Sequence, residues 1–397
     1  MKRIGLCLLC VLLLLGCTAN AEPEEIKIDS ATVIVSGEDT MAAALSLQTT
    51  IAQQWDLDLE IKEQAEEGPA IVIAVEESLN QGQYRTRIEG ERIYIEAQNS
   101  DVMVQAMRSI RSTWPVADST PHLLASQCDQ LSGTIDLQNA PVLVLTQNIR
   151  YADDEGGNKV VDRAPRFKLL AQEYLPDIIA IQEDSKLWAG ILDKFLGETY
   201  NMSGMFSSGP EDTRGNRQSI FYNKDRFEAV EEGAFVLSDT PDEFYTRFEG
   251  SKSVRHITWV LLKDQFTGKE LLLCNTHLDN STDEIRDKQL AVVLDRLGSY
   301  MEQYPTVFVG DFNATPDSSV YTTMSGLMSD PHVSATTKLS NQEITCDKYG
   351  QWKTPKRIDY MFYNDKLVAD TYRIMTDLYD GYISDHYGVT TQYSYLP

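Results

Sequence analysis

The chain has 397 residues, a formal net charge of −25 and 42% hydrophobic residues. A surface this acidic repels the phosphates of a nucleic acid, so the composition disfavours a non-specific nucleic-acid-binding protein and favours a substrate with a small or neutral body. The length is sufficient for more than one folded unit.

The N-terminus has the features of a secretory signal. It begins Met1-Lys2-Arg3, continues with an apolar run from Ile4 to Leu15, and reaches Gly16-Cys17. The run is too short for a membrane-spanning helix. Leu14-Leu15-Gly16-Cys17 resembles a bacterial lipoprotein box, in which the cysteine becomes the lipid-modified N-terminus. We therefore expect a lipoprotein signal peptide at residues 1–17 and a protein exported and held outside the cytoplasmic membrane by a lipid on Cys17; the alternative is a plain signal peptide with an incidental cysteine.

The next part of the chain predicts a small α+β accessory domain at residues 27–114, after a short acidic tether at residues 18–26. Strand and helix patterns alternate in it, with strands expected at 32–36, 71–75, 84–88 and 92–96 and helices at 41–55 and 102–114. Residues 115–138 are mixed and turn-rich, so they are expected to be a connector.

The layout of this accessory domain, with Gly82-Gln83-Tyr84-Arg85 leading into Ile93-Tyr94-Ile95-Glu96-Ala97, resembles the non-catalytic N-terminal domain of hexosaminidases. That resemblance implies contact with a glycan. A spacer domain without a ligand is the alternative. Nothing in the pattern indicates self-association, so a monomer is expected.

Three cysteines remain beyond the lipoprotein box, namely Cys128, Cys274 and Cys346. Their number is odd and their spacing matches no disulfide framework. Cys274 lies inside an apolar run and is expected to be a buried, small hydrophobic residue. A Cys128–Cys346 bridge is conceivable in an exported protein, but the sequence does not support it.

Residues 139–397 contain six apolar, strand-like runs that end in polar residues. In one of them, Thr306-Val307-Phe308-Val309 runs into Gly310-Asp311-Phe312-Asn313. Ligands collect at such strand ends in α/β folds, and an acid and an amide one residue apart suit metal-assisted phosphate chemistry, although they also make ordinary turns. The other five strand ends carry Asn148, Glu183, His277, Asp359 and the pair Asp385-His386.

The order and local form of these motifs resemble the endonuclease/exonuclease/phosphatase superfamily, and within it a secreted microbial branch. The resemblance implies an α/β (α+β) fold in which two mostly antiparallel sheets pack face to face as a β-sandwich flanked by helices, the deoxyribonuclease-like four-layer fold. It makes residues 139–397 the catalytic domain, with the active site at one end. It also implies a hydrolase that uses Mg²⁺ or Mn²⁺ to assist the attack of water on a phosphoester.

The resemblance also implies a role for most of the strand-end residues. Glu183 would ligate the metal, because a hard divalent ion prefers carboxylate oxygen, and Asn148 and Asp385 would help to hold it. Asp311 would orient or deprotonate the attacking water, and Asn313 would bind a phosphate oxygen.

Two histidines are expected at the site. Asp359 would hold the ring of His386, which would contact the phosphate either as a charged donor or as a neutral base. His277 would stabilise a phosphoryl oxygen or protonate the leaving group. Relatives commonly carry a glutamate where this chain has Asn216, and that glutamate can orient the residue equivalent to His277. The substitution puts the acid role of His277 in doubt.

Asp279 and Arg286 are weaker candidates for substrate binding. Asp279 could reach the site or cap the following helix, and Arg286 could clamp a phosphate or lie solvated on that helix.

The sequence thus favours a lipid-anchored, metal-dependent phosphodiesterase or phosphatase acting on sugar-, lipid- or inositol-linked phosphate. A secreted nuclease is one alternative, and a catalytically impaired, glycan-binding surface lipoprotein is another. Retention of the strand-end residues argues against impairment, because a defunct site would be expected to lose at least one of them.

Overall fold

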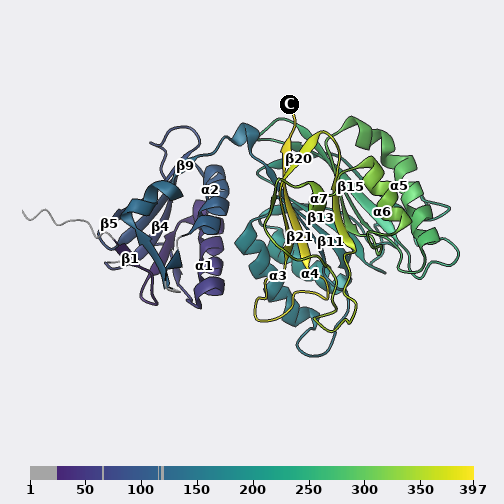
Figure 1. Ribbon diagram of the computed structural model, residues 1–397, viewed down its shortest axis with the longest axis horizontal. Helices are drawn as coiled ribbons and strands as arrows, with labels where there is room; N and C mark the ends of the chain where they lie inside the picture. The colour runs from purple at the N-terminus through teal and green to yellow at the C-terminus, as the bar shows by residue number, and fades with distance from the viewer. Residues whose placement is uncertain (1–24, 65–66, 115, 118–119) are drawn as a thin grey trace, which may run out of the picture.

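The computed structural model describes residues 25–64, 67–114, 116–117 and 120–397. The expected signal peptide, Cys17 and the tether up to residue 24 lie outside these residues. Two folded units lie side by side, the first coloured purple to blue and the second teal to yellow (Figure 1). Among the described helices, none is both long and apolar enough to span a membrane.

The first unit is a six-stranded sheet covered on one face by helices α1 (Met41–Trp55) and α2 (Ser100–Thr113). The strands expected at 84–88 and 92–96 are present as β5 (Gln83–Glu89) and β6 (Arg92–Ala97), which pair antiparallel on either side of Gly90. The sheet has the order β3 (Ile61–Lys62), β2 (Val33–Ser36), β4 (Ala70–Val75), β6 (Arg92–Ala97), β5 (Gln83–Glu89) and β9 (Gly133–Thr134).

Residues 115–138 were expected to be a connector, but the described residues of this stretch form part of the first unit. Strand β8 (Thr120–Leu124) pairs with β1 (Glu25–Lys27) and with β7 (Val116–Ala117), while β9 extends the six-stranded sheet. Leu123 and Leu131 are buried in the core of the first unit. Burial of these apolar side chains stabilises the folded first unit, so this turn-rich stretch is part of that unit.

Helices α1 and α2 lie between the first sheet and helix α3 (Val160–Tyr174) of the second unit (Figure 1). The contact is polar as well as apolar. Arg108 of α2 donates from Nη1 to Asp177 Oδ2 at 2.9 Å, and Ser46 of α1 donates to the backbone oxygen of Glu173 at 2.6 Å. Asp177 also accepts from Arg226 at 3.1 Å. The buried Asp177 carboxylate therefore binds one arginine from each unit.

The second unit contains two sheets that pack face to face, which confirms the predicted α/β sandwich. The seven-stranded sheet has the order β12 (Tyr200–Ser203), β13 (Arg217–Asn223), β11 (Ile178–Asp184), β10 (Val142–Asn148), β21 (Gly388–Tyr395), β20 (Leu367–Met375) and β18 (Thr337–Lys338). The five-stranded sheet has the order β14 (Phe227–Val236), β15 (His256–Asp264), β16 (Glu270–His277), β17 (Thr306–Asp311) and β19 (Asp359–Tyr363).

Three cores hold this unit in four layers. One lies between the sheets and includes Val144, Leu273 and Val309. The second lies between the seven-stranded sheet and helices α3 and α4 (Lys186–Leu196), and the third between the five-stranded sheet and helices α5 (Asp283–Gln303) and α6 (Ser319–Leu327). The described cysteines are buried and free, so no Cys128–Cys346 disulfide forms.

Along two strands the inward-facing positions are apolar between the sheets and polar at the strand end, where they form a cluster. In β17, Val307 and Val309 face the opposite sheet, and Asp311 is the next residue on that face. In β16, Leu271 and Leu273 face inward in the same way and His277 follows in the same row. The ends of these parallel neighbours pair His277 with Asp311, so both side chains emerge together at one end of the sandwich.

Gly310 allows β16 and β17 to approach closely beside this cluster. Its φ is +143°, and a Cβ atom would lie 1.9 Å from the backbone oxygen of Thr276. Any other residue would force the strands apart immediately before Asp311.

Candidate active site

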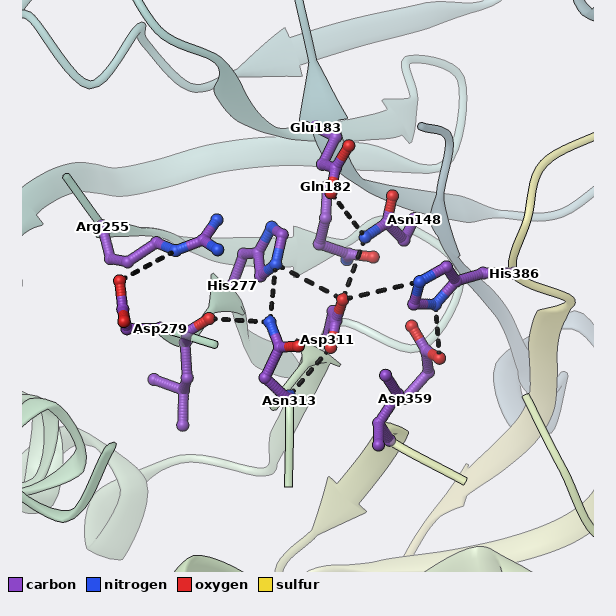
Figure 2. A network of polar contacts seen from close by, with 12 residues as sticks. Asn148, Gln182, Glu183, Arg255, His277, Asp279, Asp311, Asn313, Asp359 and His386 are labelled. Atoms are coloured by element: carbon purple, nitrogen blue, oxygen red, sulfur yellow. Dashed lines mark hydrogen bonds and ion pairs between the residues drawn. The ribbon is translucent and has the colours of Figure 1, made fainter. Parts of the chain in front are cut away.

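Asp311 lies at the centre of the polar cluster, between two histidines (Figure 2). Its Oδ2 accepts a hydrogen bond from Asn148 Nδ2 at 3.0 Å and lies 3.3 Å from His277 Nε2 and 3.9 Å from His386 Nε2. The side chain is 2% exposed. Burial, followed by the nearby charge of Asp359, raises the pKa of Asp311 to about 7.

Asn313 fixes the protonation pattern of His277. Its Nδ2 donates to the backbone oxygen of Leu278 at 3.0 Å and lies 2.9 Å from His277 Nε2. Its bond to a backbone carbonyl identifies this atom as the amide nitrogen, which can only donate. Nε2 of His277 therefore accepts from it, and the ring proton lies on Nδ1. Burial, with a contribution from Arg255, lowers the pKa of His277 well below its usual value, which agrees with a neutral ring.

The 3.3 Å contact between Nε2 of His277 and Oδ2 of Asp311 depends on which of the two groups carries a proton. Two acceptors repel each other, so an unprotonated Nε2 faces Asp311 favourably when the carboxyl group carries a proton. The raised pKa of Asp311 is consistent with that state.

Asp359 holds His386 as predicted. Its Oδ2 lies 2.9 Å from His386 Nδ1, and this leaves Nε2 directed toward Asp311. Burial works against a charge on the imidazole, but the Asp359 carboxylate outweighs it, so the pKa of His386 is raised well above its usual value. The geometry therefore favours the charged-donor alternative for His386.

Ligand atoms of Asp311, Asp359 and His386 all lie within 4.8 Å of one another. These residues could hold a metal ion as a buried group. However, the Asp359–His386 hydrogen bond occupies Nδ1 of the ring, so the arrangement also suits proton handling.

Glu183, Asn148 and Asp385 are the residues that the sequence predicted to hold a metal ion. Asn148 Nδ2 lies 3.2 Å from Glu183 Oε1, and the backbone N–H of Tyr151 donates to Glu183 Oε2 at 2.9 Å. Asp385 is 8% exposed and lines the same cavity. The carboxylate oxygens of Glu183 and Asp385 fit Mg²⁺ or Mn²⁺ and are compatible with the expected cofactor. Asn148 turns its amide nitrogen toward Glu183, and its Oδ1 accepts from the backbone N–H of Arg150 at 3.0 Å.

Backbone strain is concentrated at this set of residues. Glu183, Arg150 and Asn313 have φ values of 62°, 61° and 48°, in the left-handed region that non-glycine residues rarely adopt. Each costs free energy that the surrounding hydrogen bonds must offset. In the case of Glu183, an irregularity in the β11–β13 pairing between Ile181 and Asp184 accompanies the turn of the backbone.

The cluster forms the floor of a cavity of about 890 Å³. Although the whole chain is acidic, basic side chains line this cavity, namely Arg150, Arg255, Arg286, Lys348 and Lys356. The acidic side chains that line it are Asp154, Glu155, Glu183, Asp311 and Asp385. The local balance of charge is therefore much less negative than that of the chain, and an anionic substrate can be accommodated.

Arg255 is a site residue that the strand-end pattern missed. It lies at the start of β15, lines the cavity and is 9% exposed. Because β15 runs antiparallel to β16, the start of one strand lies beside the end of the other, which carries His277. The sequence signal was a basic residue immediately before a strand, which a search of strand ends does not detect.

Asp279 does not occupy the position expected of a substrate-binding residue. It is fully buried and accepts hydrogen bonds from the backbone N–H groups of Lys252, Ser253 and Ser281. The alternative, a cap of the next helix, is also wrong, because Thr282 caps α5 by accepting from the N–H of Ile285. Asp279 instead anchors the loop that precedes Arg255.

Arg286 is neither solvated nor free to move. It is 9% exposed, donates to the backbone oxygen of Asp279 at 3.0 Å and forms an ion pair with Asp283. It nevertheless lines the cavity, so it stays a candidate for substrate contact. Asn216 lines an adjoining cavity and does not bond to His277, whose Nδ1 has no hydrogen-bond partner among the described residues.

The fold and this site define a class of two-sheet α/β proteins in which strand ends from both sheets bring acid, amide and imidazole groups to one cavity. The model of the Endonuclease/Exonuclease/phosphatase family matches residues 145–386, and the chain belongs to this family, whose members hydrolyse phosphoester bonds. Its members commonly use divalent metals.

Solved structures support the same assignment. A family member from Bacteroides vulgatus is 25% identical, with a TM-score of 0.61 over 64% of this chain and 99% of that chain. A mannosyl-6-phosphatase from Bacteroides thetaiotaomicron is 24% identical, with a TM-score of 0.59 over 64% of this chain and 99% of that chain, and shows the shared fold.

One curated relative, Protein angel of Drosophila melanogaster, is 30% identical over 103 residues. The match covers 25% of this chain and 28% of that protein, so it concerns only part of either molecule.

Proposed function

We propose that this protein is an extracytoplasmic, lipid-anchored phosphoester hydrolase that uses Mg²⁺ or Mn²⁺. The observation that carries the proposal is the position of Asp311, which contacts Asn148 from one sheet and faces the imidazoles of His277 and His386 at the floor of an open cavity. A phosphate placed there is within reach of a carboxylate, two imidazoles and two buried arginines.

In this proposal each residue handles one part of an in-line attack by water. In its ionised form, which a pKa of about 7 makes available near neutral pH, Asp311 orients the water and accepts its proton. His386, held by Asp359, contacts a phosphoryl oxygen. Arg255 lines the cavity and binds the phosphate. Asn313 binds a phosphoryl oxygen by exchanging its hydrogen bond to His277 or to Leu278 for one to the phosphate. The P–O bond to the leaving group breaks as the bond to water forms, and the leaving oxygen takes a proton from solvent. His277 is neutral and its Nδ1 is buried, so this ring positions Asn313 through Nε2 and does not protonate the leaving group.

Glu183 and Asn148, together with Asp385, would hold the divalent cation. When bound, such an ion neutralises charge on the phosphoryl oxygens and so lowers the barrier to attack. The strained backbone at Glu183 supports this assignment, because it turns the carboxylate toward Asn148 at the edge of the cavity.

A small phosphoester is the preferred substrate class over a nucleic acid. The net charge of −25 opposes binding of a polyanion, while the cavity offers a limited number of basic side chains. A mannosyl-6-phosphatase shares the fold, which supports a sugar-linked phosphate as one candidate. The accessory unit is proposed to be a glycan-contacting or spacing element in a monomeric protein.

The test is a hydrolysis screen with bis-p-nitrophenyl phosphate, phosphomonoesters, phospholipids, inositol phosphates and DNA. Each is assayed with Mg²⁺, with Mn²⁺ and with EDTA. We expect turnover of at least one small ester that requires the metal. Full activity in EDTA would contradict the mechanism, and salt-sensitive cleavage of DNA alone would identify a nuclease.

A further inference from the structure

One wall of the catalytic cavity is a closed loop, residues 347–355, which we call the Trp352 loop. Two reciprocal backbone hydrogen bonds of 2.9 Å between Cys346 and Lys356 close its base. Inside it, the N–H of Trp352 donates to the backbone oxygen of Asp347 at 2.8 Å, and the N–H of Gly350 donates to Asp347 Oδ1 at 3.0 Å. The loop therefore has a defined shape.

The Trp352 loop is attached directly to the reacting centre. The N–H of Lys348 donates at 3.1 Å to the backbone oxygen of Asp385, the residue before His386. Tyr387, the residue after His386, donates from its hydroxyl to Asp347 Oδ2 at 2.6 Å. A group bound by this loop is thus positioned relative to the phosphate that His386 would contact.

The backbone of the loop is strained where it faces the cavity. Lys348 and Tyr349 have φ values of 52° and 61°, followed by Gly350 at 71°. Two consecutive non-glycine residues in the left-handed region cost free energy. The Tyr349 hydroxyl donates to Asp154 Oδ2 at 2.9 Å, and this hydrogen bond ties the strained segment to residues near Arg150.

Two lysines share the indole of Trp352. Lys348 Nζ lies 4.7 Å and Lys356 Nζ 5.5 Å from the ring centroid, and all three side chains line the cavity. In the part of the chain that the structure describes, neither lysine has a carboxylate within 4.0 Å, whereas Asp154, which also lines the cavity, is paired with Arg150. Two cations on one aromatic ring repel each other, and an anion between them would relieve the repulsion.

We propose that the Trp352 loop is a subsite for a second, non-scissile phosphate on the substrate. The substrate class is then a phosphoester whose polar ring carries another phosphate, with the ring carbons against the indole and the second phosphate between Lys348 and Lys356. The proposal rests on the proposed function, since it takes the reacting phosphate to lie at Asp311 and His386. A polar ring that carries two phosphate groups occurs both in soluble sugar bisphosphates and in lipid headgroups.

Calorimetry in EDTA measures this subsite without turnover. The affinities of a hexose 1,6-bisphosphate and of the matching hexose 6-phosphate are compared in the wild-type protein, in the Lys348→Ala/Lys356→Ala double variant and in Lys353→Ala. Lys353 is an exposed lysine of the same loop that does not line the cavity, so it is the matched control. Wild type and Lys353→Ala are expected to prefer the bisphosphate by about tenfold or more, and the double variant by less than about threefold.

A parallel arm distinguishes the two sources of the second phosphate. The protein and its double variant, each carrying Cys17→Ser so that the proposed lipid anchor is absent, are sedimented with phosphatidylcholine vesicles with and without phosphatidylinositol 4-phosphate. Cosedimentation that the double variant loses assigns the subsite to a lipid headgroup, and bisphosphate selectivity without cosedimentation assigns it to a soluble substrate.

Equal affinities for the two hexose phosphates in the wild type, with no vesicle binding, would overturn the subsite. Absence of metal-dependent turnover in the hydrolysis screen would instead overturn the proposed function, so the two failures are distinguishable.

Discussion

Asn148 donates a hydrogen bond from Nδ2 to Asp311 Oδ2 over 3.0 Å and thereby joins the end of β10 in one sheet to the end of β17 in the other. The same nitrogen lies 3.2 Å from Glu183 Oε1. The proposed water-orienting carboxylate and the proposed metal ligand are therefore connected through one amide. Because the core between the sheets is closely packed, a small shift of either sheet would change the distance between Asn148 and Asp311.

Replacement of Asp311 by Asn is expected to abolish most activity without unfolding the protein. The amide preserves the shape of the side chain but cannot accept the proton of water. We expect kcat/KM for the best small ester to fall by about 10³-fold, with an unchanged circular dichroism spectrum. Asp317→Asn, at an exposed acid in the next turn, is the control. Activity within tenfold of wild type would remove Asp311 from its proposed role.

Glu183→Gln tests the metal site. Loss of the formal charge weakens binding of a hard cation, so the Mg²⁺ concentration for half-maximal activity should rise by about 100-fold. The measurement is a Mg²⁺ titration of hydrolysis. Glu155→Gln changes an exposed acid that lines the same cavity and should leave the titration unaltered. An unchanged Mg²⁺ requirement in Glu183→Gln would place the ion elsewhere, for example at the group formed by Asp311, Asp359 and His386.

Asp359→Asn tests the orientation of His386. The hydrogen bond of 2.9 Å to Nδ1 would be weakened or reversed, and the ring would lose the charge that favours its protonated form. We expect kcat to fall by about 10²-fold, with little change in the Mg²⁺ requirement. Asp365→Asn, whose side chain is 95% exposed, serves as the control. A normal kcat in Asp359→Asn would contradict the role of this pair.

Asp177→Asn should destabilise the contact between the two units in a pH-dependent manner. Burial alone would raise the pKa of Asp177, but Arg108 and Arg226 outweigh it and hold the pKa below its usual range. A depressed carboxyl pKa stabilises the folded state above the unfolded value of about 3.9, and this contribution is lost as the pH falls through the folded pKa.

The difference in unfolding free energy between wild type and Asp177→Asn should therefore be about 3 kcal/mol at pH 7 and should shrink below about pH 4. Urea denaturation at several pH values measures it. The exposed Asp129→Asn variant should show no comparable loss. A pH-independent difference would mean that the ion pairs with Arg108 and Arg226 contribute little.

Cys17→Ser tests the proposed lipid anchor. Serine cannot form the thioether, so labelled palmitate should no longer be incorporated and the protein should leave the membrane fraction. Cys10→Ser, within the apolar run of the signal, is the control. Normal labelling of Cys17→Ser would exclude this cysteine as the lipidated residue.

Much of the site was predictable because strand ends have a simple geometry. An apolar run that alternates across a sheet carries its last residue to a known face, so His277 and Asp311 could be placed at the same edge before the fold was known. The pair formed by Asp359 and His386 followed from the family resemblance and is present at 2.9 Å.

Other features could not be predicted, because they depend on contacts between distant segments. Arg255 is placed by antiparallel pairing with β16, and Asp279 is turned away to bind the backbone of a loop. The residues expected to form a connector add strands to the first unit because Leu123 and Leu131 complete its core. Local composition does not reveal such partners.

The sequence by itself thus determined the family, the two-sheet fold and the strand ends at which the candidate site residues lie, since alternation and residue type are local properties that do not depend on tertiary contacts. Only the tertiary structure decided which charges meet. It brought Asn148 within hydrogen-bonding distance of Asp311 and left Nδ1 of His277 without a partner among the described residues. It also placed the amines of Lys348 and Lys356 over the indole of Trp352. Protonation and charge pairing depend on distance and burial, which are fixed when the chain folds.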